Sequence, residues 1–160
     1  MIPLETVKIF TSGKMSGLSE EEQRTWRRKI QDEIELRFTF TKSPYSLIFE
    51  HPTDKYSTAH SETLSELESA KYEKEAMIWD LTQIVNSNIV IVNLKDIATS
   101  VGTLMELGYI KALNENTNKH IYVLGLGKTN NSHPWLEDVL FHTEETEQDL
   151  AEFIINMLLS

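Results

Sequence analysis

Short, mostly apolar runs along the chain predict strands. Such runs occupy residues 7–10, 45–49, 89–92 and 121–124. The run at 89–92 is apolar and β-branched throughout, which is typical of a strand covered on both faces of a sheet.

Between these runs, apolar residues recur at helical spacing. Residues 19–22 (SEEE) form a capping box, and its acidic side chains complement the dipole of a helix that starts there. Trp26, Ile30 and Ile34 follow at intervals of four and make one apolar stripe. A first helix is therefore predicted from about residue 20.

Three further helices are predicted downstream. One ends at about residue 85 and has four apolar residues that we expect to face inward: Met77, Leu81, Ile84 and Val85. Another covers residues 100–114. The last covers roughly residues 145–159, with Glu144, Glu145 and Glu147 as its acidic first turn.

The alternation of strands and helices predicts βαβ units with right-handed crossovers, and hence a mainly parallel α/β sheet. A chain of 160 residues fits a single domain, residues 1–160. In such sheets the ligand crevice lies beyond the carboxyl ends of the strands, where the strand order reverses. Three loops are therefore expected to carry the chemistry: residues 11–18, 50–56 and 93–102.

Composition and charge exclude several classes of function. The formal net charge of −10 opposes binding of a nucleic-acid polymer, although one Lys and a few backbone amides can still hold a small anion. The absence of Cys excludes a disulfide framework, a Cys-ligated zinc site and a thiol nucleophile. The five His show no pairing at i, i+4. We therefore expect no metal and no other cofactor.

Nothing along the chain predicts a membrane partner. Residues 1–4 (MIPL) have neither the basic start nor the long apolar run of a signal peptide, and no later run is long enough to span a bilayer. Together with the absence of Cys, this predicts a cytoplasmic protein.

The segment at residues 100–109 (SVGTLMELGY) carries the first candidate for chemistry. Ser100 is a good N-cap, so a helix is expected to begin at the next residue. The predicted packing face of this helix consists of Val101, Leu104, Met105 and Ala112.

Glu106 lies off that face, one turn after Gly102. The glycine costs helix stability, but it leaves no side chain in front of the Glu106 carboxylate. A carboxylate with a cleared approach near the crevice suits the nucleophile of a glycosidase. The alternative is a solvated Glu beside a Gly that only relieves packing.

Asp80 lies inside the predicted apolar stripe of its helix, three residues after Met77 and four before Ile84. An ionised carboxylate there needs partners, or its pKa shifts. Asp80 either caps a neighbouring loop or joins Glu106 at one crevice. Two converging carboxylates fit retaining glycosidic chemistry, in which their environments divide the roles.

The segment around Glu106 resembles the nucleophile helix of the nucleoside 2-deoxyribosyltransferases and of their relatives, the 2-deoxynucleoside 5'-monophosphate N-glycosidases. The resemblance extends to residues 8–15 (KIFTSGKM), residues 80–81 (DL), residues 88–94 (NIVIVNL) and residues 133–136 (HPWL). It thus covers the chain in the family's order. It implies a doubly wound, flavodoxin/Rossmann-like, five-stranded sheet with helices on both faces.

The resemblance also implies roles for particular residues. Glu106 is expected to attack the anomeric carbon, so that one base leaves and another base or water then takes the sugar. Asp80 is expected to contact or protonate the base. The loop of Gly13, Lys14 and Met15 is expected to lie against the base or the 5' end of the sugar.

A homo-oligomer is also implied, with each site completed by a neighbouring subunit. His133 and the residues up to 136 are predicted to be the element that closes the site. The expected ligands are a nucleoside or nucleoside monophosphate and a free nucleobase.

One position departs from the family pattern. The family usually has Tyr at the strand position of Phe10, where its hydroxyl holds the nucleophilic carboxylate, and Phe10 has no hydroxyl. Tyr109, Tyr56 and Tyr45 are candidates to replace it; without a replacement, activity is expected to be low or altered.

Ser100, six residues before Glu106, bears on the 5' end of the substrate. Asp at this position is associated with the transferases and Ser with the monophosphate hydrolases. At a helix N-terminus Ser100 favours an anion, and Lys14 is the candidate cation. The alternative is that Ser100 only caps its helix. Tyr56 is a candidate to flank the base.

Three functions therefore stay open. The leading one is a nucleoside 2-deoxyribosyltransferase-like enzyme that works through a glycosyl–Glu106 intermediate. The second is a nucleoside 5'-monophosphate N-glycosidase, which transfers the sugar to water. The third is a nucleotide-binding module with weak or no turnover.

Overall fold

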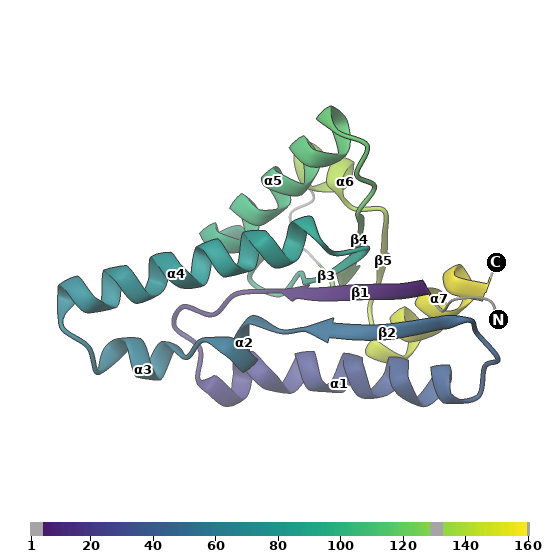
Figure 1. Cartoon of the computed structure of the whole chain (residues 1–160), viewed down its shortest axis with the longest axis horizontal. Coiled ribbons are helices and arrows are strands. Elements are labelled where there is room, and N and C mark those ends of the chain that lie inside the picture. Colours follow the sequence, from purple (N-terminus) through teal and green to yellow (C-terminus); the bar gives the residue numbers. More distant parts are fainter. Residues whose placement is uncertain (1–4, 129–132, 160) are drawn as a thin grey trace.

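The computed structural model describes residues 5–128 and 133–159. They form a five-stranded sheet in which every strand runs parallel to its neighbours. In spatial order the strands are β2 (Tyr45–Glu50), β1 (Glu5–Ser12), β3 (Ile89–Asn93), β4 (Tyr122–Leu126) and β5 (His142–Glu144) (Figure 1). This is the flavodoxin-like order 2-1-3-4-5, which reverses between β1 and β3. The predicted fold class is confirmed.

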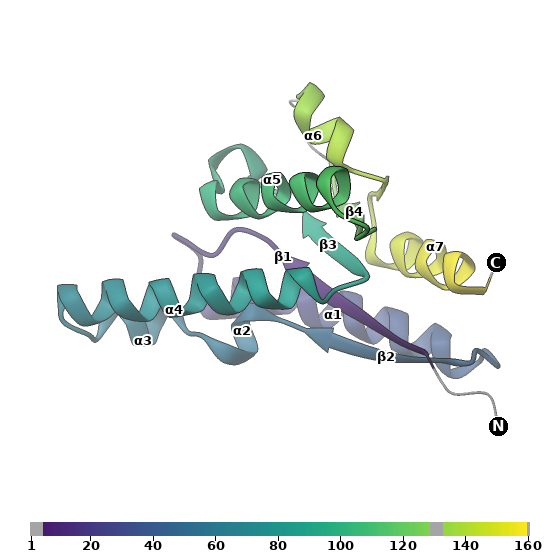
Figure 2. The ribbon, with the colours of Figure 1, turned by 45° about the horizontal axis from the view of Figure 1, so that its top comes forward.

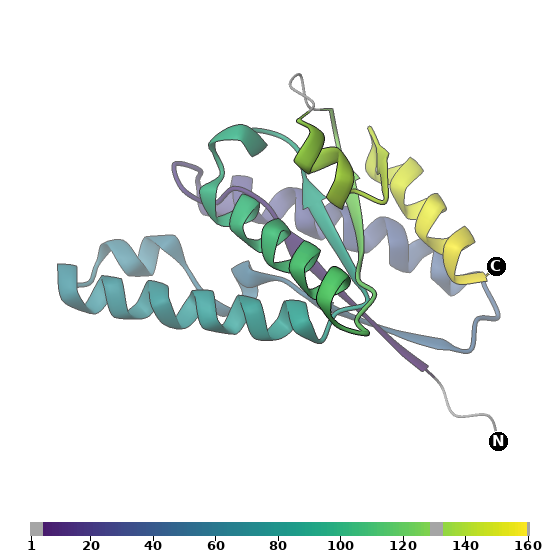
Figure 3. The ribbon, with the colours of Figure 1, turned by 90° about the horizontal axis from the view of Figure 1, so that it is seen from above.

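Helices cover both faces of the sheet (Figures 1 and 3). On one face α1 (Glu20–Thr39) and α7 (Glu147–Leu159) contact each other. On the other face lie α4 (Glu66–Val85), α5 (Val101–Asn116) and α6 (Pro134–Val139). The short helices α2 (Pro52–Lys55) and α3 (Thr58–Glu62) and the 3-10 helix η1 (Ile97–Thr99) lie in the connections. Across the described part of the chain, no helix is long and apolar enough to cross a membrane.

Side chains of β1 alternate between the two faces, because successive side chains of a strand point to opposite sides. Ile9 packs into the core beneath α1 and α7. Phe10 packs into the opposite core, with Val90, Val92 and Leu107. The same alternation sends the next two residues, Thr11 and Ser12, to opposite faces.

The predicted strands and helices are present, and most of the strands are longer than predicted. The last helix begins at Glu147 rather than Glu145, because Glu144 ends β5. No apolar run located β5, since its three residues, HTE, carry no hydrophobic pattern. Residues 1–4, on which the signal-peptide prediction partly rests, lie outside the described residues.

The predicted packing face of α5 is wrong. Val101, Leu104 and Met105 are 72%, 40% and 71% exposed, and Ala112 is exposed as well. The buried residues of α5 are instead Thr103, Leu107 and Ile110, a face rotated around the helix. On α4, Met77 is likewise exposed rather than inward-facing, whereas Ile84 is fully buried as predicted. An apolar stripe predicts that one face of a helix will be covered, but it does not predict which element covers that face.

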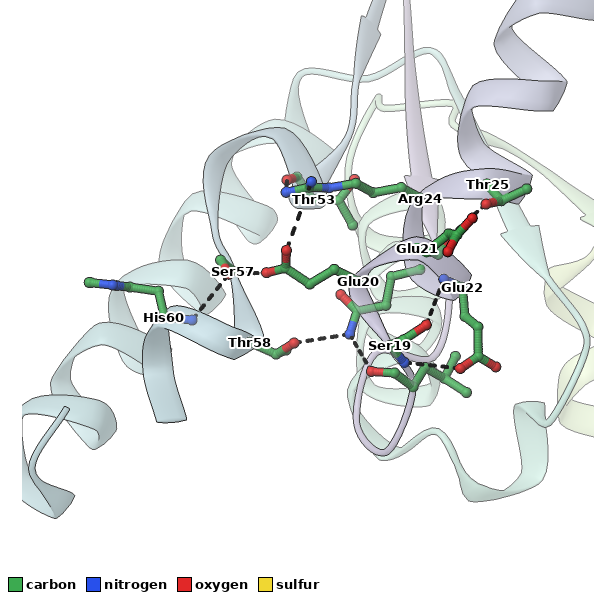
Figure 4. Close-up of polar contacts among 12 residues, drawn as sticks. Ser19, Glu20, Glu21, Glu22, Arg24, Thr25, Thr53, Ser57, Thr58 and His60 are labelled. Carbon is green, nitrogen blue, oxygen red and sulfur yellow. Dashed lines mark hydrogen bonds and ion pairs between the residues drawn. The ribbon is translucent and has the colours of Figure 1, made fainter. Parts of the chain in front are cut away.

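The start of α1 anchors the loop that follows β1. The predicted capping box is present: Ser19 Oγ accepts from the Glu22 amide, and the Glu22 carboxylate accepts from the Ser19 amide (Figure 4). One turn later, buried Gln23 donates to the Met15 carbonyl at 2.9 Å and to the Thr58 hydroxyl at 3.0 Å. The loop after β1 and α3 are therefore held by the same helix.

The first half of α4 reaches beyond the carboxyl ends of the strands, and α3 lies alongside it (Figures 1 and 2). The Tyr72 hydroxyl accepts from the Ser57 amide at 2.9 Å, and Ser61 and Ser69 share a hydrogen bond of 2.6 Å. These contacts fix the α3–α4 pair as an extension beside the crevice.

Candidate active site

Glu106 of α5 faces the carboxyl end of β1. The Ser12 hydroxyl donates to Oε2 of Glu106 at 2.8 Å. Ser12 is the last residue of β1, pairs with Val92 of β3, and is 1% exposed. Glu106 is therefore not the solvated surface residue of the alternative interpretation.

Asp80 of α4 is the second carboxyl of this region. It is half-buried, and its Oδ1 atom is buried without a hydrogen-bond partner among the described residues. It therefore does not cap a neighbouring loop through that oxygen. Its charge acts on Glu106, which brings the two predicted catalytic residues into one site.

Both carboxyls hold their protons more tightly than usual. The pKa of Glu106 is raised to about 8, first by burial and then by Asp80, against the Ser12 hydrogen bond and Arg27. Burial also raises the pKa of Asp80 to about 7, against the charge of Arg27. Because two neighbouring buried carboxylates repel, the pair gives up its protons in coupled steps. A proton held by such a pair at neutral pH is available for general acid catalysis.

Arg27 supplies the positive charge of the site from the opposite face of the sheet. It is 1% exposed and donates to the Gln23 carbonyl at 2.6 Å, the Thr11 hydroxyl at 3.2 Å and the Gly13 carbonyl at 3.4 Å. Burial lowers its pKa to about 10, so the guanidinium stays charged at neutral pH. No carboxylate of the described residues forms an ion pair with it, and its field reaches both Glu106 and Asp80.

A buried hydrogen-bond chain continues from Arg27. Thr11 Oγ1 contacts His51 Nδ1 at 2.7 Å, and His51 Nε2 contacts Gln31 Oε1 at 2.6 Å. Burial lowers the pKa of His51, so the ring is neutral, with the proton on Nε2 donated to the Gln31 carbonyl oxygen. This chain locks the end of β1 against α1.

Four residues of this site were not predicted as site residues: Thr11, Ser12, Arg27 and His51. The sequence held a signal for Arg27, because Gln23, Arg27, Ile30 and Ile34 share one helical face, on which a cation is unusual. The sequence held a signal for Ser12 as well. Ser12 lies two residues after Phe10, so its side chain points to the same face of β1 as the side chain of Phe10.

The loop after β1 lies at the reversal point, as predicted. A Cβ on Gly13 would lie 2.7 Å from Trp26, so glycine is required there by close packing. Met15 contributes its carbonyl to Gln23. Lys14 Nζ donates to Thr99 Oγ1 at 3.0 Å, which places this cation beside the residue that precedes Ser100.

Ser100 occupies the N-cap position of α5, but its side chain does not cap the helix. Its hydroxyl donates to Thr103 Oγ1 at 2.7 Å instead. The prediction of a capping side chain is therefore wrong, although the helix begins at Val101 as expected. At Gly102 a Cβ would meet no heavy atom within 4 Å, the helix's own nearby backbone aside.

Within the described part of the chain, the tyrosines predicted to replace a missing hydroxyl at Phe10 form no hydrogen bond with Glu106, whereas Ser12 does. The Tyr56 hydroxyl donates to the Glu75 carbonyl at 3.3 Å, and its ring meets Trp79 edge-on. Burial, Glu75 and then Asp80 raise the pKa of Tyr56, which places Tyr56 on the Asp80 side of the crevice.

His133 is not brought to the carboxyl pair of its own chain. It is exposed, accepts from the Trp135 amide at 3.2 Å and thereby caps α6. With Trp135 and Leu104 it lines an apolar groove of about 490 Å³ between α5 and α6.

Among the described residues, no group of three His, Asp or Glu side chains is placed to hold a metal ion. The functional groups brought together are two half-buried carboxyls, a buried serine hydroxyl and a buried guanidinium. Such a set can act as a nucleophile, hold a proton and supply a fixed countercharge. The fold and the site together define a flavodoxin-like α/β protein with a carboxyl pair near the carboxyl end of β1.

Comparison with solved structures supports the fold. The chain is similar to a 2-deoxyribosyltransferase from Bacillus psychrosaccharolyticus, with a TM-score of 0.64, 16% identity, and coverage of 95% of this chain and 96% of that chain. It also matches an azoreductase from Bacillus anthracis str. Sterne, at a TM-score of 0.38 and 13% identity, which is too distant to inform the argument. No protein-family model and no curated protein matches the sequence.

The raised pKa of Glu106 predicts how stability depends on pH. The folded protein keeps this proton up to about pH 8, whereas an unfolded chain loses it near pH 4.5. The folded state binds more protons between these values, so the free energy of unfolding falls as pH rises through this window. Glu106→Gln cannot titrate and should lose on the order of 2 kcal/mol less than the wild type between pH 5 and 8.

Urea unfolding at several pH values measures this slope. The matched control is Glu152→Gln on α7, because Glu152 is exposed. It should keep the wild-type slope. Equal slopes for Glu106→Gln and the wild type would contradict the buried, protonated state of Glu106.

Proposed function

We propose that the protein is a nucleoside 2-deoxyribosyltransferase-like enzyme of the cytoplasm. Its substrates are a (deoxy)nucleoside and a free nucleobase, and the sugar passes through a covalent bond to Glu106. The observation that carries this proposal is the half-buried pair of Glu106 and Asp80, in which, among the described residues, a hydroxyl donates to Glu106 and none to the buried Oδ1 of Asp80. The fold shared with a 2-deoxyribosyltransferase agrees with it.

The two half-reactions use the pair in opposite senses. A Glu106 oxygen attacks the anomeric carbon while the C–N bond to the base breaks, and the bonding electrons leave with the base. Asp80 gives the departing base a proton. A second base then attacks the same carbon, returns its proton to Asp80 and releases the Glu106 carboxylate. Two displacements retain the configuration of the sugar.

Exchange assays test this function. Incubation with a deoxynucleoside and a second free base should yield the exchanged nucleoside, detected by chromatography. Glu106→Gln should reduce exchange about a thousandfold or more, because an amide is a poor nucleophile. Glu152→Gln is the matched control and should keep wild-type exchange.

Failure of exchange with intact binding would identify a nucleotide-binding module instead. Turnover that survives in Glu106→Gln would contradict the mechanism.

A second candidate function is hydrolysis of nucleoside 5'-monophosphates. It is favoured by Lys14, which donates to Thr99 two residues before α5, and by the start of α5, where no side chain of the described residues caps the helix. A helix N-terminus and an ammonium group together favour a phosphate.

The variant Lys14→Met separates the two functions. If the substrate carries a 5'-phosphate, kcat/KM for the monophosphate should fall about tenfold or more, while that for the free nucleoside changes little. Lys119→Met, beyond the far end of α5, should change neither. An equal loss on both substrates would contradict a phosphate site at Lys14.

A homo-oligomer is part of the proposal. Val101, Met105 and Tyr109 form an exposed stripe at i, i+4, i+8 along α5, and Trp135 of α6 is 74% exposed. Large exposed apolar patches mark interaction surfaces. The proposed partner is a second copy, with His133 and its helix near the neighbour's site.

A charge on this stripe should weaken the oligomer. Met105→Glu is expected to shift the mass in light scattering toward the monomer, because a buried unpaired carboxylate opposes association. Leu67→Glu, 83% exposed on the distal turn of α4, is the matched control and should keep the wild-type mass. An unchanged mass for Met105→Glu would contradict this interface.

A further inference from the structure

The two oxygens of the Glu106 carboxylate are not equivalent. Oε2 accepts the Ser12 hydroxyl at 2.8 Å, whereas no described residue donates to Oε1. Building on the function proposed above, we propose that Ser12 is the positioning residue for the nucleophile. Its hydroxyl holds Oε2 of Glu106 and leaves Oε1 as the oxygen that attacks the sugar.

Ser12 is well suited to hold another side chain in place. Its backbone is fixed by the pairing of β1 with β3, opposite Val92. A serine has one side-chain torsion before its oxygen, so little rotamer entropy is lost when the hydroxyl is ordered. At 1% exposure, water competes little for this hydrogen bond, which is stronger in such surroundings than in solvent.

At the end of β1, Ser12 is the residue placed to hold the Glu106 carboxylate. Phe10 points to the same face two residues earlier, but its ring is fully buried among Val90, Val92 and Leu107 and has no donor. Thr11 has a hydroxyl, but it points to the other face, toward Arg27 and His51. Ser12 is therefore the hydroxyl at the carboxyl end of β1 that meets Glu106 of α5.

The same hydrogen bond distinguishes the two carboxyls. The charged groups that act on Glu106 are Asp80 of α4 and Arg27 of α1, and Arg27 favours ionisation of both acids. Only Glu106 receives the Ser12 hydroxyl, while the buried Oδ1 of Asp80 has no described donor. Ser12 thus shifts the pair toward the microstate that the reaction needs, with Glu106 ionised and the proton on Asp80, against the burial that raises the pKa of Glu106.

The hydrogen bond can persist through the covalent step. As Oε1 bonds to the anomeric carbon, the C–N bond breaks and the base leaves with the electron pair and the Asp80 proton. Oε2 becomes the carbonyl oxygen of the glycosyl ester and still accepts from Ser12. When a base or water displaces the ester, the electron pair returns to Oε1.

The variant Ser12→Ala removes the hydroxyl with little change in volume. Hydrogen bonds to charged groups support an expected fall in kcat of about tenfold to a hundredfold. KM should change less than about twofold, because Ser12 touches Glu106 rather than substrate. The acid limb of the kcat–pH profile should move about one pH unit higher, since Glu106 loses a donor that stabilises its charge. Ser12→Thr keeps the hydroxyl and should restore both readouts.

The titration of Glu106 itself gives a readout that does not need turnover. In carboxyl ¹³C NMR, its signal is the one missing from Glu106→Gln, and its midpoint should rise in Ser12→Ala but not in Ser12→Thr. Ser87→Ala is the matched control: Ser87 is also a buried serine, but it bonds the Gln83 carbonyl at the end of α4. It should leave the Glu106 midpoint and kcat unchanged.

The two measurements separate the two proposals. An unchanged Glu106 midpoint in Ser12→Ala overturns the role of Ser12, whatever the wild type turns over. Absence of product from the wild type with every nucleoside and monophosphate overturns the proposed function, whatever the titration shows. A raised midpoint with a fall in kcat and a steady KM supports both.

Discussion

The last two residues of β1 send their hydroxyls to opposite faces of the sheet, and the candidate site depends on this alternation. Thr11 meets Arg27 and His51 on the α1 side, and Ser12 meets Glu106 on the α5 side. One strand end is thereby tied to both helical layers. Because a strand has a side-chain period of two, a register change of one residue would exchange these partners and break both sets of contacts.

Burial gives the site its chemistry, and it also destabilises the charged forms of the two carboxyls. Placing Glu106 and Asp80 together in a poorly solvated region raises the pKa of each and makes them compete for protons. The compensating charge, Arg27, lies across the sheet and forms no direct ion pair with any described carboxylate. A direct ion pair would hold the nucleophile in place and shield it. A charge at longer range favours ionisation while leaving the carboxylate free to react.

Much of the fold was predictable because its signals are local. Apolar runs located four strands, and the capping box located the start of α1. Family resemblance added the doubly wound class and directed attention to Glu106 and Asp80. The short strand β5 escaped, because three polar residues carry no periodicity and pair only when β4 is already in place. The packing face of α5 was predicted wrongly, because apolar character at Val101 and Met105 does not say which surface will cover it.

The sequence by itself determined the βαβ order and, through the family resemblance, indicated the two acidic residues of the candidate site. Tertiary structure decided what surrounds them: the donor from Ser12, the buried charge of Arg27 and an Oδ1 of Asp80 that has no hydrogen-bond partner among the described residues. The physical reason is the distance along the sequence over which each effect acts. Propensity and periodicity act within a few residues, whereas Ser12 and Glu106 are 94 positions apart and meet only once β1, β3 and α5 are packed.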